Sequence, residues 1–171
     1  MNTGETIYYE SPVGALKITA SSDGITELHF VSTEKYGKED EPGIVYSHPE
    51  SAILKKVLTQ LDDYFAGRNL DFDLPLHQQG TAFQQRVWNE LCKIKPGATL
   101  SYLQLSKNLG DIKAIRAVGT ANGRNNIAII VPCHRVIGSN GSLVGYAGDL
   151  WRKKWLLEHE ARNCNGVQTL F

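Results

Sequence analysis

The chain lacks the features that define several large classes of protein. Its 171 residues contain no long apolar run, and a membrane-spanning helix needs about 18 such residues, so no contact with a membrane is expected. The 18 basic residues are balanced by 18 acidic ones. A formal net charge of zero argues against a strongly basic nucleic-acid binder, but it does not exclude a local basic face. The polar first ten residues predict no signal peptide.

Cysteine is scarce as well. Cys92, Cys133 and Cys164 are odd in number and show no Cys-x-x-Cys spacing. Neither a disulfide framework nor a four-ligand zinc site is therefore expected, and we predict no metal and no cofactor. A protein that keeps free thiols belongs in a reducing compartment, which predicts a cytoplasmic location.

The composition is that of an ordinary globular protein, with 42% hydrophobic and 21% charged residues. The length suits one domain of usual size or two small ones. A polar run at residues 77–80 follows Pro75, and helix signals dominate beyond it. We therefore predict an N-terminal domain over residues 1–76 and a C-terminal domain over residues 77–171.

The N-terminal part predicts a small α/β unit. Short β-prone segments at residues 7–9, 16–19 and 25–30 are separated by turn sequences. Connections this short imply an antiparallel sheet. A charged stretch over residues 32–50 predicts a loop, and apolar residues at helical spacing predict a helix over residues 51–66, stopped by Gly67.

The C-terminal part carries three helix starts before its reactive motif. Residues 81–84 and 101–104 both fit a capping box, and Pro96 is expected to end the first helix. Asp111 is expected to cap a third helix over residues 112–121, which Asn122 and Gly123 would stop. The last two helices fit a helix-turn-helix, although plain helix packing explains the pattern equally well.

Two further segments complete this part of the chain. Residues 127–131 are apolar and mostly β-branched, which predicts a buried strand or extended strut. A last helix is expected over residues 150–160, with Trp151, Trp155 and Leu156 on its apolar side.

Cys133 is the candidate for chemistry. Pro132 stiffens the backbone before it, and His134 follows it directly. A neighbouring imidazole can take the proton of a thiol and leave the reactive thiolate. A lone cysteine in an apolar run is, however, more often an inert core residue.

The stretch Pro132-Cys133-His134-Arg135-Val136 resembles the active-site signature of the O6-alkylguanine-DNA alkyltransferases, also called methylated-DNA–protein-cysteine methyltransferases. The resemblance covers roughly residues 81–160. It implies a small ribonuclease H-like α/β domain with an antiparallel sheet, followed by a mainly helical domain with a helix-turn-helix.

The same resemblance implies the roles of the site residues. Cys133 is the nucleophile, His134 draws its proton through a water, Glu160 completes the relay, and Asn125 braces the turn. The assignment of Glu160 depends entirely on the resemblance. The residues implied to bind the substrate are Tyr102, Val136, Tyr146 and Ala147. Those implied to bind DNA are Tyr102, Arg116, Ala117 and Arg124. Asp149 stands where the family often has Gly.

The implied activity is direct repair of DNA. The alkyl group of O6-alkylguanine, and by the same expectation of O4-alkylthymine, moves irreversibly to Cys133. A dialkyl sulfide is a poor electrophile, so each molecule acts once. The implied partner is double-stranded DNA, bound through its minor groove by a monomer with the target base flipped out. On DNA the protein would be nucleoid-associated, or nuclear in a eukaryote.

With no net charge, phosphate contacts must come from a local group of cations. The candidates are Lys107, Lys113, Arg116, Arg124 and Arg135. Arg135 has a second reading, as a packing or salt-bridge residue behind the cysteine. Two other functions stay open: a lesion-binding protein without catalysis, and a Cys-His-Glu hydrolase.

Overall fold

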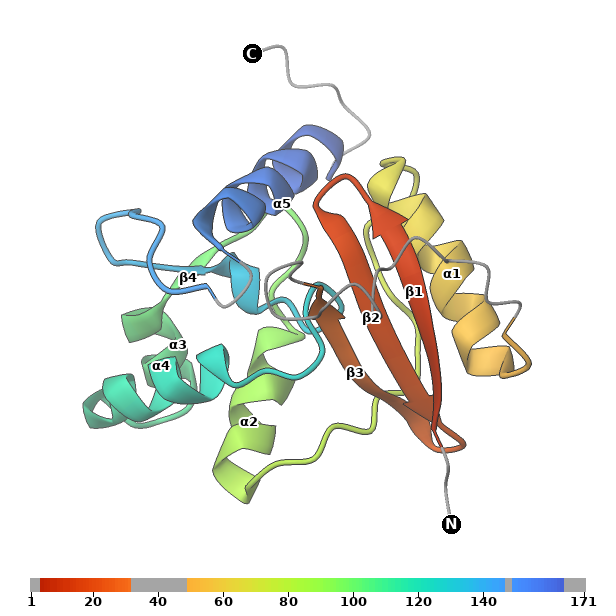
Figure 1. Ribbon diagram of the computed structural model, residues 1–171. Helices are drawn as coiled ribbons and strands as arrows, with labels where there is room; N and C mark the ends of the chain where they lie inside the picture. The colour runs from red at the N-terminus through yellow and green to blue at the C-terminus, as the bar shows by residue number, and fades with distance from the viewer. Residues whose placement is uncertain (1–3, 32–48, 147–148, 165–171) are drawn as a thin grey trace. The chain divides into compact units, whose positions relative to one another are not determined.

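Alternating apolar residues build an antiparallel sheet in the first part of the chain. The computed structural model describes residues 4–31, 49–146 and 149–164, and the chain divides into two units, Met1–Gln79 and Gly80–Phe171 (Figure 1). In the first unit the strands β1 (Glu5–Ser11), β2 (Gly14–Ser21) and β3 (Gly24–Phe30) pair antiparallel in that order. The predicted sheet is confirmed, with longer strands. The domain boundary predicted after residue 76 lies close to the division between the two units. That the two units are independent domains stays a prediction.

The helix α1 (Ala52–Phe65) contacts all three strands of this sheet (Figure 1). Ser51 caps its first turn by accepting a hydrogen bond from Leu54 N at 3.3 Å. Gly67 follows its end with a φ of 74°, a conformation that glycine adopts without a steric cost. The helix predicted over residues 51–66 is confirmed. Most of the loop predicted over residues 32–50 lies outside the described residues.

The second unit is mainly helical, as predicted. Its helices are α2 (Ala82–Leu91), α3 (Tyr102–Asn108), α4 (Ile115–Gly123) and α5 (Leu150–Asn163), and two 3-10 turns, η2 (Ile112–Ala114) and η3 (Cys133–Arg135), accompany them. Two short strands, β4 (Leu100–Ser101) and β5 (Val136–Ile137), pair in parallel. Within the described residues, no helix has the length and apolar character needed to cross a membrane.

One of the two predicted capping boxes is complete. Gln84 N donates to Thr81 Oγ1 at 3.1 Å, and Thr81 N donates to Gln84 Oε1 at 2.9 Å. At the start of α3, Gln104 N donates to Ser101 Oγ at 3.0 Å, but the Gln104 side chain donates to Asn108 instead. Only half of the second box forms, because the glutamine has a partner one helical turn ahead.

One predicted helix end was wrong. The helix α2 stops at Leu91, well before Pro96. The third helix begins with η2, where Asp111 accepts a hydrogen bond from Lys113 N at 3.0 Å, and continues as α4 to Gly123. The helix therefore ends at the predicted stop of Asn122 and Gly123, with Asn122 buried in its last turn. The pair formed by α3 and α4 has the helix-turn-helix order, with the turn passing through Gly110.

The strand predicted over residues 127–131 was also wrong, because this segment is a buried turn. Val131 N donates to Ile127 O at 3.1 Å, and Ile130 N donates to Ala128 O at 2.8 Å. Ile129 has a φ of 70°, which a β-branched residue rarely adopts. An apolar run shows that a segment is buried, but it does not distinguish a strand from a compact turn. The strand comes only after the cysteine, at β5.

The helix α5 buries only part of the side that was predicted: Leu156 is buried as expected and Trp155 is half-buried. Trp151 is 52% exposed, whereas the buried positions are Lys153, Leu156, His159 and Glu160. Apolar patterning failed here because two charged side chains find partners inside the unit.

The complete capping box predicts how much stability is lost when Thr81 is replaced. Replacing Thr81 with Ala leaves backbone donors of α2 without a partner and is expected to lower the free energy of unfolding by about 1 kcal/mol. Urea denaturation measures this change. Thr59→Ala is the matched control, because Thr59 is exposed within α1 and Ala favours the helix. Equal stability of the two variants would contradict the assigned cap.

Candidate active site

A tight turn holds Cys133 in place. Pro132 has φ and ψ of −82° and 63°, and Cys133 N donates to Val131 O at 2.8 Å, which together form an inverse γ-turn. Cys133 then begins η3 and is only 7% exposed. The thiol therefore lies on a stiff backbone and is almost fully shielded from water.

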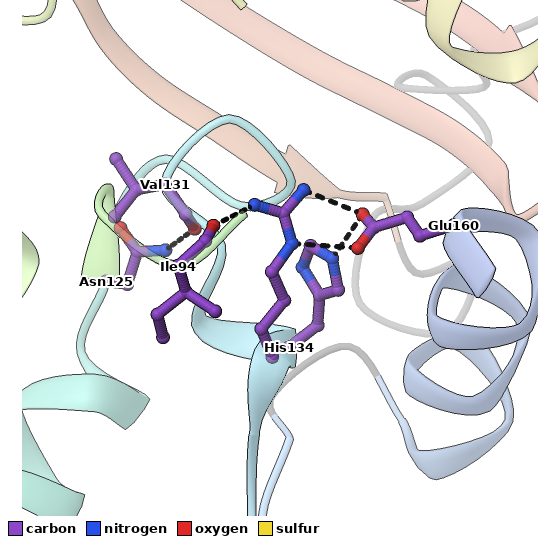
Figure 2. A network of polar contacts seen from close by, with 6 residues as sticks. Ile94, Asn125, Val131, His134 and Glu160 are labelled. Atoms are coloured by element: carbon purple, nitrogen blue, oxygen red, sulfur yellow. Dashed lines mark hydrogen bonds and ion pairs between the residues drawn. The ribbon is translucent and has the colours of Figure 1, made fainter. Parts of the chain in front are cut away.

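Asn125 connects this turn to the sulfur. Its Nδ2 lies 2.8 Å from Val131 O (Figure 2). The same nitrogen lies 3.2 Å from both Ile127 O and Cys133 Sγ. Its Oδ1 accepts a hydrogen bond from Ile127 N at 3.1 Å. These contacts hold both ends of the turn that contains the strained Ile129, and they direct an N–H group at the thiol.

A buried carboxylate joins the two residues that follow the cysteine. Glu160 Oε2 lies 2.8 Å from His134 Nε2, and Arg135 donates to both Glu160 oxygens at 2.8 and 3.0 Å (Figure 2). Arg135 Nη1 donates to Ile94 O at 2.5 Å. His134 and Glu160 have no exposed surface, and Arg135 is 5% exposed. Arg135 therefore lies in the interior. Its prediction as a phosphate-binding residue was wrong, and its second reading as a salt-bridge residue is confirmed.

These contacts fix the charge of each partner. Burial by itself raises the pKa of Glu160, but His134 and Arg135 outweigh it and hold the pKa well below its ordinary value. Burial lowers the pKa of His134 despite the nearby Glu160, so the imidazole is neutral at pH 7. A neutral ring that bonds the carboxylate through Nε2 carries its proton there. Nδ1 is then an acceptor, and it has no hydrogen-bond partner among the described residues.

The thiol itself is held in its protonated form. Burial raises the pKa of Cys133, while the hydrogen bond from Asn125, the charge of Lys153 and the backbone N–H groups of Cys133 and His134 act in the opposite direction. Reaction therefore requires a base, and these donors reduce the cost of forming the thiolate.

Lys153 is a site residue that sequence reasoning missed. Its side chain is fully buried, and Nζ donates to Val136 O at 2.6 Å and to Val144 O at 2.9 Å. Burial lowers its pKa, and the charge of Cys133 raises it. Its burial could have been predicted from the sequence, because Lys153 lies on the same face of the helix as Leu156 and Glu160. Asn122 was missed as well; its Nδ2 lies 3.5 Å from Cys133 O.

Two of the substrate-binding candidates, Tyr102 and Tyr146, interact electrostatically with Cys133. Burial and the charge of Cys133 raise the pKa of Tyr146 well above its ordinary value. The Tyr102 hydroxyl donates to Val144 O at 3.3 Å and to Gly145 O at 3.5 Å. Val136 is buried in β5. Ala147 lies outside the described residues.

Apart from the half-buried Tyr102, the DNA-binding candidates occupy exposed positions of the helix-turn-helix. Arg116 and Ala117 are exposed on α4, and Arg124 is exposed at its end. Lys107 and Lys113 are exposed as well, so four of the five predicted cations face solvent and Arg135 does not. In the described part of the chain, no group of three or more His, Cys, Asp or Glu residues is placed to hold a metal ion.

The two halves of the chain match two family models. Residues 6–78 match the ribonuclease-like domain of 6-O-methylguanine DNA methyltransferase, and residues 82–162 match its DNA binding domain. The chain belongs to this family. The ribonuclease-like match also confirms the predicted fold of the first half.

Relatives within the family are similar over most of their length. A methylated-DNA–protein-cysteine methyltransferase of Mycobacterium leprae is 45% identical over 95% of both chains. The constitutive enzyme of Bacillus subtilis is 47% identical over 81% of this chain and 84% of its own. A crystal structure of Mycobacterium tuberculosis OGT in complex with DNA has a TM-score of 0.79 and 40% identity, covering 92% of this chain and 93% of that one.

The buried carboxylate predicts a large loss of stability. Glu160→Gln leaves Arg135 as a buried cation without an anion, and we expect a loss of roughly 3–5 kcal/mol at pH 7, measured by urea unfolding. Glu158→Gln is the control, because its partner Lys154 is 3.8 Å away and both side chains are exposed.

The pH dependence of this loss has a definite sign. The pKa of Glu160 is lower in the folded state, so its contribution is complete above the unfolded-state pKa of about 4.3 and disappears as the pH falls through the lower folded value. The stability gap between the wild type and Glu160→Gln should therefore narrow in acid. A gap that stays constant with pH would contradict the assignment.

The hydrogen bond from Asn125 to sulfur predicts a shift in titration. Asn125→Ala removes a donor that stabilises the thiolate, so the pKa of Cys133 should rise further. The measurement is the pH dependence of alkylation by iodoacetamide, followed on the Cys133 peptide by mass spectrometry. Asn108→Ala, on the surface of α3, should leave the midpoint unchanged. An unchanged midpoint in Asn125→Ala would show that the contact does not act on the thiol.

Proposed function

We propose that this protein repairs O6-alkylguanine in double-stranded DNA by transferring the alkyl group to Cys133, once per molecule. The observation that carries the proposal is a shielded thiol, bonded by Asn125, next to a neutral imidazole whose Nδ1 is an available acceptor. Membership of the family supplies the substrate class. We extend the proposal to O4-alkylthymine as a second substrate.

The proposed reaction begins with proton transfer. The thiol proton passes through a water to His134 Nδ1, and the Glu160 carboxylate stabilises the imidazolium that forms. His134 and Arg135 together keep Glu160 ionised by holding its pKa below the ordinary value. The same logic of nucleophile, base and orienting carboxylate operates in hydrolytic triads. Here the thiolate is the product of the first step.

The second step is an in-line displacement at a saturated carbon. The sulfur forms a bond to the alkyl carbon while the bond between that carbon and guanine O6 breaks, and the electron pair leaves with the oxygen. Tyr146 is our candidate donor to the departing base, since its raised pKa keeps the hydroxyl protonated. The thioether that remains offers water no leaving group, so the protein is consumed.

The proposed DNA contacts lie on the helix-turn-helix of the predicted C-terminal domain, residues 77–171. The helix α4 would enter the minor groove, with Arg116 filling the gap left by the flipped base and Tyr102 contacting the adjacent phosphate. Flipping costs a few kcal/mol, which this insertion offsets in part. The exposed cations Lys107, Lys113 and Arg124 would bind phosphates. We propose that a monomer binds in this way, in the cytoplasm or at the chromosome.

The deciding experiment uses duplex DNA that contains a single O6-methylguanine. After mixing, intact and peptide mass spectrometry should find one methyl group on the Cys133 peptide and none on the peptide of the exposed Cys92. Cys133→Ser should take up no methyl group. Tight binding of the lesion without methylation would instead support a lesion-binding protein, and turnover of a model ester would support a hydrolase.

A further inference from the structure

Three hydrogen bonds tie the loop at residues 138–146 to the rest of the site. Val144 O accepts from Lys153 Nζ at 2.9 Å and from the Tyr102 hydroxyl at 3.3 Å, and that hydroxyl also lies 3.5 Å from Gly145 O. Tyr102 is the first residue of α3, in the helix-turn-helix. One hydroxyl therefore links the proposed DNA-binding element to the loop that carries Tyr146.

The loop matters because it carries Tyr146, which interacts electrostatically with Cys133, and the Cys133 thiol is only 7% exposed. Cys133 interacts electrostatically with Tyr146 on the loop and with both residues that tie it, Tyr102 and Lys153. An alkylated base must reach the sulfur, so we expect the loop to move aside when the base enters. Gly145, whose carbonyl is one of the two acceptors of the Tyr102 hydroxyl, has a φ of 58° and permits backbone conformations that other residues avoid.

The tie made by Tyr102 is the weaker of the two. Its donor is neutral, it is shared between two carbonyls, and both distances exceed the usual 2.7–2.8 Å of such bonds. A phosphate oxygen is charged, and hydrogen bonds to charged acceptors are shorter and roughly twice as strong. A phosphate that reaches Tyr102 would therefore take its hydroxyl away from Val144 and Gly145.

We propose that Tyr102 makes Cys133 selective for alkylated bases within DNA over free alkylated bases. This inference rests on the proposed function. In the free protein the Tyr102 hydroxyl holds the loop over the thiol, and a DNA phosphate releases it. A free base carries no phosphate, so the hydrogen bonds from Tyr102 to the loop stay in place and limit access to the thiol. Tyr102 acts through the loop and is a positioning residue for the reaction.

The test compares Tyr102→Phe with the wild type by the rate at which the Cys133 peptide is alkylated. The probes are free O6-benzylguanine, the same base with undamaged duplex added, and duplex containing O6-methylguanine. We expect Tyr102→Phe to react with the free base about 2- to 10-fold faster, the range of one neutral hydrogen bond. We expect it to react with the damaged duplex about 10-fold slower or more, since the phosphate contact is lost.

Undamaged duplex provides a readout that a merely structural role would not change. It should accelerate the free-base reaction of the wild type and leave that of Tyr102→Phe unchanged. The control is Tyr9→Phe, which removes a hydroxyl bonded to Asp62 at 2.6 Å in the first unit. This control should behave as the wild type with all three probes.

Two outcomes would overturn the inference. One is a free-base rate in Tyr102→Phe no higher than in the wild type. The other is equal acceleration of both proteins by undamaged duplex. Failure of the wild type to take up methyl from damaged DNA would instead refute the proposed function, so the two failures are distinguishable.

Discussion

The arrangement of the site depends on one buried charge, the carboxylate of Glu160. Removing a carboxylate from water costs several kcal/mol, and only well-placed partners offset that cost. Arg135 supplies two hydrogen bonds to it and His134 a third, while Ile94 O occupies a remaining donor of Arg135. The contact joins α5, η3 and the segment after α2. Any displacement of α5 would separate these charges, so the position of His134 beside the cysteine is fixed.

The second constraint is the shielding of the thiol. Burial favours the protonated sulfur, whereas Asn125 and Lys153 favour the thiolate. The balance keeps the sulfur protonated until its proton is transferred to a base. Asn125 favours the thiolate while holding the turn around Ile129, so backbone strain and sulfur chemistry share one side chain. Strain of this kind is found where the surroundings enforce it.

Local signals succeeded where the partner is close in sequence. The cap at Thr81, the stop at Gly67 and the three strands of the sheet all follow from residues within a few positions of one another. Predictions failed where a distant partner competed. Trp151 faces outward because Lys153 has two carbonyls to bond inside the unit, and the apolar run at residues 127–131 folds into a turn that Asn125 supports.

The sequence by itself determined the three-stranded sheet, the main helices, the family resemblance and the identity of the nucleophile, because short motifs carry that information. Only the tertiary structure decided the states of Glu160, Arg135 and Lys153. Glu160 lies 26 residues from His134 in sequence, and a glutamate near a helix end is ordinarily solvated. Burial and pairing of a charge depend on which surfaces meet, and that is settled when the helices pack.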